Sequence, residues 1–178
     1  MITTRPTALL CLVLLAFASA MSGVSRAAGA ETCARTTTLL VVRHADRQGS
    51  DDALTDAGRE RAQVLAHVAS QAAVTAIYHS DTERTRLTAA PLAAQLGITP
   101  VVLPGKDIDG LLRDILANHC GETVLVVGHS NTVPLIIKAA GGPSLPDLDE
   151  TAYDDLFVVT VHPGAPGFVH LRYGAATH

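Results

Sequence analysis

Residues 37–43, Thr-Thr-Leu-Leu-Val-Val-Arg, decide the class of fold. The run is β-branched and apolar up to its last residue, which is the pattern of a strand buried on both faces. Residues 122–127, Glu-Thr-Val-Leu-Val-Val, repeat this pattern. Near-continuous apolar strands are typical of parallel sheets whose two faces are both covered by helices. The two runs therefore predict an α/β protein.

Helical segments separate the strands along the rest of the chain. We expect helices at about residues 57–70 and 131–140, and two more between them: one that Ser80 or Asp81 caps and that ends near Leu96, and one that Asp107 caps. Strands are expected at residues 74–78, 101–103 and 122–127. Residues 156–161 and 168–171 are expected to form a hairpin. This alternation predicts a three-layer sandwich with a mostly parallel sheet, helices on both faces and a C-terminal hairpin at the edge. Ligands of such sheets bind beyond the carboxyl ends of the strands.

The first thirty residues have the layout of a secretory signal peptide. Arg5 precedes an uncharged apolar run at residues 8–18, and small residues follow up to Ala30. A membrane anchor is the alternative, but this run has only about half of the roughly 20 apolar residues that cross a bilayer. We therefore expect cleavage after Ala30 or at an earlier alanine, and one mature domain at residues 31–178 without a stable membrane span. Its expected location is the periplasm or the cell exterior.

The charge of the mature chain argues against a nucleic-acid partner. The full sequence has 13 basic and 17 acidic residues; loss of residues 1–30 removes two arginines and no acid, which leaves 11 against 17 and a net charge of −6. Binding to a phosphate backbone requires a basic surface. Six arginines nevertheless fall within 44 residues, namely Arg43, Arg47, Arg59, Arg61, Arg84 and Arg86. Such a cluster suits a small anion in a local pocket, although we expect Arg59 and Arg61 on a solvated helix face.

Three predicted strands end in residues with chemical function. The first runs into Arg43 and His44, the strand at 122–127 runs through Gly128 into His129, and the strand at 74–78 is followed by Arg84. If the strands at 37–43 and 122–127 are parallel neighbours, the imidazoles of His44 and His129 lie at the same edge of the sheet. The sequence then places two histidines and two arginines on one rim.

Phosphoryl transfer needs this set of side chains. Its transition state carries negative charge on the equatorial oxygens, which guanidinium groups match with paired donors. A neutral imidazole such as His44 can attack phosphorus, and neighbouring arginines lower its pKa and keep it neutral. A second, protonated imidazole at His129 would donate to a phosphate oxygen. A helix that opens near Asn131 would point backbone amides at the same anion.

Four segments, in this order, resemble the motifs of the histidine phosphatase superfamily, also called phosphoglycerate mutase-like. They are LLVVRHADR at residues 39–47, LTDAG at 54–58, SDTERTRLTA at 80–89, and VVGHS at 126–130. The resemblance implies that His44 is the nucleophile, that Arg43 and Arg84 bind the phosphate, and that His129 is the second histidine of the pocket. Ala45 and Asp46 depart from the family's usual glycine and glutamate, which affects the shape of the first loop rather than the nucleophile.

The general acid is the least defined member of the predicted site. In the family it lies between the second arginine and the second histidine, where this chain has four carboxylates: Asp107, Asp109, Asp114 and Glu122. Glu122 begins a strand and Asp114 should lie in the middle of a helix, which leaves Asp107 and Asp109 after a short strand. Asp107 is the preferred candidate, and its alternative role is only to cap the helix that follows.

Two further residues are candidates for substrate binding. Arg47 either extends the phosphate pocket or faces solvent, and Asn131 either orders the pocket or starts a helix. A metal site at His44 and Asp46 is disfavoured, because the adjacent arginine repels a cation, and no cofactor is expected. The remaining histidines have no motif around them and are expected on the surface or in structural roles; they are His67, His119, His162, His170 and His178.

The two cysteines outside the signal segment, Cys33 and Cys120, are predicted to form a disulfide. An even count of cysteines in an exported protein favours a bridge. Each cysteine precedes one of the two apolar strands, so parallel neighbouring strands would bring the cysteines together at the amino ends, far from the active site.

The sequence therefore predicts an exported phosphomonoester hydrolase that works through a phosphohistidine on His44. The short stretch between Arg84 and His129 leaves little room for the lid that mutases of the family carry, and an open site admits water. Expected substrates are a phosphorylated small molecule or an envelope glycan. The alternatives are a non-catalytic protein that binds phosphate or phosphoglycan on the same fold, and a mutase.

Overall fold

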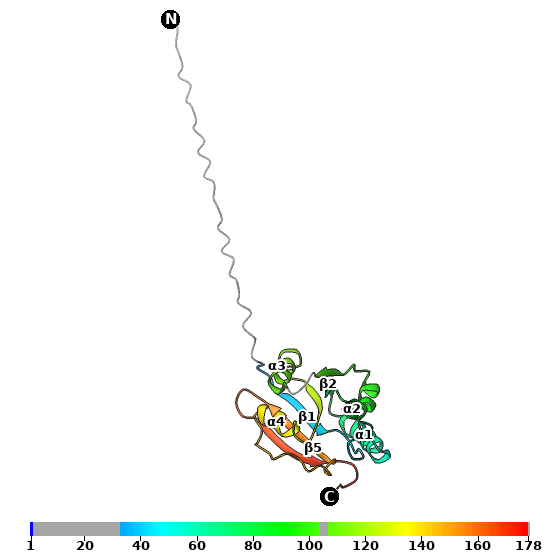
Figure 1. Ribbon diagram of the computed structural model, residues 1–178. Helices are drawn as coiled ribbons and strands as arrows, with labels where there is room; N and C mark the ends of the chain where they lie inside the picture. Colours follow the sequence, from blue (N-terminus) through cyan, green and yellow to red (C-terminus); the bar gives the residue numbers. More distant parts are fainter. Residues whose placement is uncertain (2–32, 104–106, 178) are drawn as a thin grey trace.

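The computed structural model describes Met1 and residues 33–103 and 107–177. The predicted signal peptide lies outside these residues apart from Met1, so its cleavage and the start of the mature domain stay predictions. The elements, in chain order, are β1 (Thr37–Arg43), α1 (Asp56–Ala69), β2 (Val74–Ser80), α2 (Glu83–Leu96), β3 (Val101–Leu103), α3 (Ile108–Asn118), β4 (Thr123–Gly128), α4 (Val133–Ala139), β5 (Asp155–Val161) and β6 (Gly167–Arg172) (Figure 1).

The strands form one mixed sheet in the order β3-β2-β4-β1-β5-β6. The first four of these strands are parallel, and β5 pairs antiparallel with both β1 and β6. The C-terminal hairpin therefore closes one edge, as predicted. In the pairing of β1 with β4, Arg43 lies opposite Gly128, so the residues that follow these strands start from the same level of the sheet.

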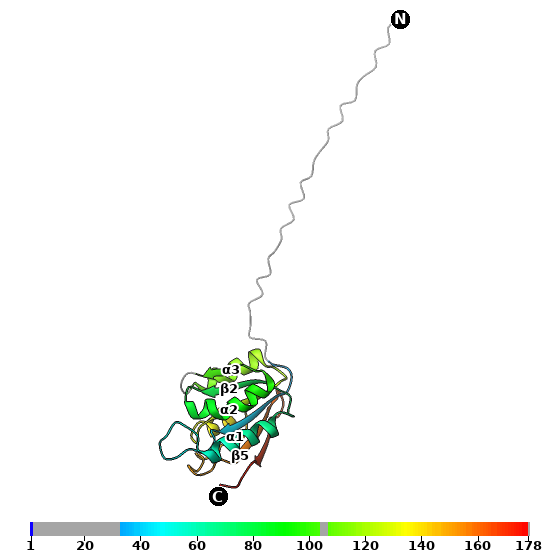
Figure 2. The same cartoon turned by 90° about the vertical axis from the view of Figure 1, so that its right-hand side faces the viewer.

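Helices cover both faces, which confirms the three-layer α/β sandwich. Figure 1 shows α1 and α2 on one side of the sheet and α3 and α4 on the other, and Figure 2 shows α1 and α2 in front of the sheet. Leu39 and Val41 of β1 pack into the core under α3 and α4, while Leu40 and Val42 pack under α1 and α2. Adjacent residues of this strand point to opposite faces, so both layers need apolar side chains and the run in β1 is continuous.

Two helices begin later than the sequence predicts. The cap of α2 is Thr82 rather than Ser80 or Asp81, because β2 continues through Ser80 and this residue still belongs to the strand. Helix α4 starts at Val133 rather than at residue 131. A turn precedes it, in which the amides of Thr132 and Val133 both donate to the carbonyl oxygen of His129.

Arg61 is buried, contrary to the expectation of a solvated face. Its side chain is only 4% exposed, and it makes a paired contact with Asp46, with Nε 2.6 Å from one carboxylate oxygen and Nη2 3.3 Å from the other. Its Nη1 donates to the carbonyl oxygens of Tyr173 and Ala175. Arg61 therefore joins α1 to the loop after β1 and to the C-terminal segment.

The structure joins Cys33 and Cys120 in the predicted disulfide, with Cα atoms 5.4 Å apart. The bond ties the segment before β1 to the turn before β4, at the amino ends of these neighbouring strands. Within the described ranges, no helix combines the length and the apolar composition that crossing a membrane requires.

Candidate active site

A cavity of about 470 Å³ lies at the carboxyl end of the parallel strands. Its lining brings together five side chains that the sequence selects as candidates, namely His44, Arg47, Arg84, His129 and Asn131. Ser130, Asp147 and Glu150 complete the described lining. The parallel pairing of β1 with β4 produces this convergence, because His44 and His129 each follow directly on one of these strands.

His44 is held as a neutral imidazole with a fixed tautomer. Its side chain is 1% exposed, and Nδ1 lies 2.9 Å from the carbonyl oxygen of Ala45. Because a carbonyl only accepts hydrogen bonds, Nδ1 carries the proton and Nε2 keeps its lone pair. Burial lowers the pKa of His44 and outweighs the opposing hydrogen bond to Ala45; together with the charges of Arg43 and Arg84, it brings this pKa to about 3. The nucleophilic form is thus the resting form.

His129 lies next to His44, with ring centroids 5.5 Å apart. Arg84 Nη2 donates to Nδ1 of His129 at 3.3 Å, so the ring proton is on Nε2, which lies 2.7 Å from Ser80 Oγ. Burial, followed by the charge of Arg84, lowers the pKa of His129 to about 4. The sequence predicts a protonated second histidine, whereas the ligand-free site holds it neutral, because burial disfavours the charged ring and the nearby guanidinium groups add to this effect. An added anion would favour protonation.

Arg84 is positioned by a carboxylate that the sequence analysis missed. Asp52, in the loop between β1 and α1, accepts a hydrogen bond from Arg84 Nη1 at 2.7 Å and from the amide of Glu83 at 3.1 Å. The Glu83 amide and the Arg84 guanidinium hold the pKa of Asp52 below its usual value. Asp52 precedes no strand end and belongs to no motif in the sequence, so only the folded loop shows its role at the start of α2.

Both Nη atoms of Arg43 donate hydrogen bonds to the loop between α4 and β5. Nη1 donates to the carbonyl oxygens of Asp149 and Ala152 at 2.7 and 3.2 Å, and Nη2 donates to Glu150 Oε2 at 2.7 Å. The ring of Tyr153 covers the guanidinium carbon at 4.4 Å. The loop between α4 and β5 therefore fixes the orientation of this arginine, and Nε is left for another acceptor.

Three arginine Nε atoms at this site are buried and have no hydrogen-bond partner within the described part of the chain. They belong to Arg43, Arg47 and Arg84. A buried polar group without a partner costs about 1–3 kcal/mol, and such groups are rare in folded proteins. Arg47 and Arg84 line the cavity together with the two neutral imidazoles, whereas Arg43 is not part of the described lining and lies close enough for its charge to act on His44. The three guanidinium groups and the two imidazoles form a site that is complementary to a tetrahedral oxyanion.

Glu150 is the second residue that sequence reasoning missed. Its carboxylate accepts from Ser130 Oγ at 2.5 Å and lies 3.9 Å from Arg47 Nη2. The Ser130 hydroxyl, followed by the charges of Arg43 and Arg47, lowers the pKa of Glu150. The proline- and acid-rich composition of residues 144–151 was the available signal, but composition does not show that this loop folds back over the ends of β1 and β4.

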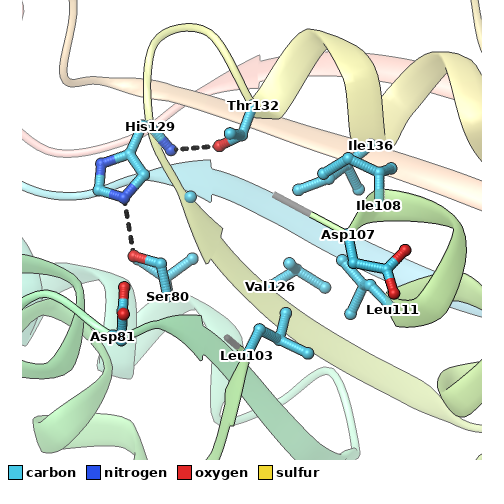
Figure 3. Close-up of a pocket in the computed structure, with 12 residues that line it drawn as sticks. Ser80, Asp81, Leu103, Asp107, Ile108, Leu111, Val126, His129, Thr132 and Ile136 are labelled. Carbon is cyan, nitrogen blue, oxygen red and sulfur yellow. Dashed lines mark hydrogen bonds between the residues drawn. The ribbon is translucent and has the colours of Figure 1, made fainter. Parts of the chain in front are cut away.

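Asp107, the preferred general acid from sequence, lies outside the cavity that holds His44. It caps α3, and Oδ1 accepts from the amide of Gly110 at 2.8 Å. It also lines a neighbouring pocket of about 190 Å³, whose walls include Leu103, Ile108 and Leu111 and which His129 shares. Figure 3 shows the Asp107 carboxylate on the side of α3, apart from the imidazole of His129. Its predicted capping role is confirmed, and its catalytic role stays a prediction.

The loop after β1 is held by contacts that explain the motif at residues 54–58. The amide of Ala45 donates to Thr88 Oγ1 at 2.8 Å, and the carbonyl oxygen of Asp46 accepts from the amide of Thr55 at 3.0 Å. A side chain at Gly58 would collide with this same carbonyl oxygen. Asp46 itself pairs with Arg61 and is not part of the described cavity lining, so this departure from the family's usual glutamate lies outside the cavity.

The described residues contain no group of three or more histidine, cysteine, aspartate or glutamate side chains arranged to hold a metal ion. His119 and His170 make local contacts with Glu122 and Asp155, and His67 is exposed on α1. None of these three lines the cavity. His178 lies outside the described residues.

Known proteins resemble the chain in part of its sequence and in its fold. Residues 37–107 match the sequence model of the histidine phosphatase superfamily (branch 1). No curated protein sequence matches the chain.

Solved structures of similar fold cover most of the chain. One, described as mycobacterial hydrolase 1, has 17% identity and a TM-score of 0.61 over 80% of this chain and 100% of its own. A putative phosphohistidine phosphatase SixA from Nakamurella multipartitia has 22% identity and a TM-score of 0.56 over 80% and 99%. The protein histidine phosphatase SixA complexed with tungstate has 20% identity and a TM-score of 0.60 over 76% and 96%. At these identities the likeness establishes the fold.

Proposed function

We propose that the chain is a member of the histidine phosphatase superfamily, whose sequence model matches residues 37–107, and that it is an exported phosphomonoester hydrolase in which His44 forms a phosphohistidine. The observation that carries the proposal is the cavity that a neutral His44 shares with His129, Arg47 and Arg84, with the charge of Arg43 close by. Guanidinium donors match the oxygens of a phosphoryl group, and an imidazole with a free Nε2 is a competent nucleophile. A related structure binds tungstate, which is also a tetrahedral oxyanion.

In the first half of the reaction, the Nε2 lone pair of His44 forms a bond to phosphorus while the bond from phosphorus to the ester oxygen breaks. The imidazole becomes positively charged, and Nδ1 keeps its proton and continues to donate a hydrogen bond to the carbonyl oxygen of Ala45. Arg43, Arg47 and Arg84 neutralise the charge on the equatorial oxygens. His129 gains a proton as the anion enters, and it then donates to a phosphate oxygen.

In the second half, a water molecule attacks phosphorus and the phosphorus–nitrogen bond breaks. Inorganic phosphate leaves, and His44 returns to its neutral form. The guanidinium groups supply the positive charge that a metal ion provides in other phosphatases, so the proposed mechanism requires no metal and no cofactor.

The proposed location is the periplasm or the cell exterior, and the proposed substrate is a phosphorylated small molecule or an envelope glycan. The disulfide between Cys33 and Cys120 supports an oxidising compartment. The layout of residues 1–30 supports export in the same way.

Steady-state hydrolysis of 4-nitrophenyl phosphate tests the activity. We expect turnover by the mature protein that EDTA leaves unchanged, and a loss on the order of 10⁴–10⁶-fold in His44→Ala, because removal of a covalent nucleophile has effects of this size. His67→Ala is the matched control, since this histidine is exposed on α1. A wild-type protein that binds phosphate but shows no turnover would instead indicate the non-catalytic alternative, and transfer to a second hydroxyl without phosphate release would indicate a mutase.

A further inference from the structure

Glu150 occupies the outer part of the cavity whose inner part is formed by His44. The Glu150 side chain is 66% exposed, whereas His44 is 1% exposed, and both line the same cavity. In-line displacement at phosphorus places the nucleophile and the leaving group on opposite sides. With His44 on the buried side, the leaving oxygen must lie on the solvent side, where Glu150 is.

Two hydrogen bonds hold the Glu150 carboxylate at this position. Oε2 accepts from Arg43 Nη2 at 2.7 Å and Oε1 accepts from Ser130 Oγ at 2.5 Å. Arg43 also lies close enough to His44 for its charge to lower the pKa of that ring. One guanidinium group therefore contacts Glu150 and acts on the proposed nucleophile.

The balance of charge favours protonation of this carboxylate when substrate binds. Around the free cavity, the three guanidinium groups of Arg43, Arg47 and Arg84 face the carboxylates of Glu150 and Asp52. Asp147 also lines the cavity, so the positive and negative charges cancel. A phosphomonoester dianion then leaves an excess of negative charge, even after His129 has gained its proton. Asp52 is held by Arg84 and by the Glu83 amide, so Glu150 is the carboxylate that can accept a proton and still touch the ligand.

We propose that Glu150 is the general acid of the reaction, a role that rests on the proposed phosphatase function. As the bond from phosphorus to the ester oxygen breaks, the Glu150 carboxyl gives its proton to that oxygen, which leaves as an alcohol. The resulting carboxylate then accepts a proton from the water molecule that attacks phosphohistidine, and the carboxyl is restored. Each turnover consumes one water molecule and releases one alcohol and one phosphate, so atoms and protons balance.

Two other carboxylates are less suited to this role. Asp107 caps α3 and lines the neighbouring pocket rather than the cavity that holds His44. Asp147 lines the cavity but makes no hydrogen bond within the described part of the chain. Both provide matched control variants, because each is an acid close to the site that the proposal assigns no proton transfer.

A series of aryl phosphates with leaving groups of increasing pKa tests the proposal. The substrates are 2,4-dinitrophenyl, 4-nitrophenyl and phenyl phosphate, measured with wild type, Glu150→Gln, Asp107→Asn, Asp147→Asn and His44→Ala. For Glu150→Gln we expect nearly unchanged kcat/KM on the dinitrophenyl ester and a loss of about 10²-fold or more on phenyl phosphate, because only a poor leaving group needs a proton. The two aspartate variants should follow the wild-type dependence on leaving group.

Three outcomes would overturn the assignment of Glu150. An equal loss for all three esters would mean that Glu150 only positions Arg43, and an equal gain would mean that it only competes with phosphate. A selective loss in Asp107→Asn or Asp147→Asn would move the acid to that residue. His44→Ala separates this result from the proposed function, because a failure of the phosphatase proposal would leave hydrolysis of the dinitrophenyl ester intact in that variant.

Discussion

The resting state of the proposed nucleophile is set by one hydrogen bond and by burial. The carbonyl of Ala45 selects the tautomer of His44, and the buried environment with its arginines removes the second proton. Hydrogen bonds with Arg84 and Ser80 select the tautomer of His129 in the same way. In the ligand-free site, the positive charge therefore lies on the guanidinium groups, which are too basic to lose a proton.

This arrangement makes the stability of the protein depend on pH. The pKa of His44 is about 3 in the folded state against 6.5 for an unperturbed imidazole, so the unfolded chain binds more protons between these values. The free energy of unfolding is therefore constant above about pH 6.5 and falls as the pH decreases from there toward 3, by up to about 1.4 kcal/mol per pH unit for this group.

Urea unfolding at about pH 7.5 and about pH 5 measures this dependence. The His44→Asn variant keeps a donor for the Ala45 carbonyl and lacks the titrating ring, so it should lose less stability than wild type on acidification. Equal losses in the two proteins would show that His44 does not carry a lowered pKa.

At the scale of elements, Arg61 joins three parts of the chain that the sequence keeps far apart. It lies on α1, binds Asp46 in the first loop, and donates to carbonyl oxygens of the segment after β6. Lysine cannot make the paired contact with a carboxylate and the two carbonyl contacts at once.

We expect Arg61→Lys to lower the free energy of unfolding by about 3–5 kcal/mol, the range for breaking a buried ion pair. Arg59→Lys is the control on the same helix, and its change should stay within about 0.5 kcal/mol because Arg59 is mostly exposed. Chemical denaturation of both variants gives the comparison. Similar values for the two would mean that the Asp46 pair contributes little.

The elements also show why part of the site can be predicted and part cannot. His44 and His129 follow the two most apolar strands, so the pattern of the strands alone places them at one edge of a parallel sheet. Asp52 and Glu150 lie on loops, whose path depends on tertiary contacts such as the hydrogen bonds from Arg84 and Arg43. Arg61 was misplaced for a related reason, since its partner Asp46 is fifteen residues away in the chain.

For the molecule as a whole, the disulfide and the cavity lie at opposite ends of the sheet. Cys33 and Cys120 bridge the amino ends of β1 and β4, and the cavity follows their carboxyl ends. The covalent bond restricts the unfolded chain across 87 residues, which stabilises the folded state without touching the site.

Reduction of this disulfide should therefore lower stability and leave catalysis unchanged. We expect Cys33→Ser with Cys120→Ser to cost about 2–5 kcal/mol, seen as a lower Tm, while kcat/KM for 4-nitrophenyl phosphate below the Tm stays at the wild-type value. A proportional loss of kcat/KM would show that the amino ends of the strands are coupled to the catalytic geometry.

The most direct test of the central claim is to identify the phosphorylated residue. The mature protein is mixed with a labelled phosphomonoester, quenched in alkali during turnover, digested, and mapped by mass spectrometry. We predict a single phosphoryl group on His44 that is stable in alkali and lost in acid. A label that survives acid, or one that maps to another residue, would contradict the account.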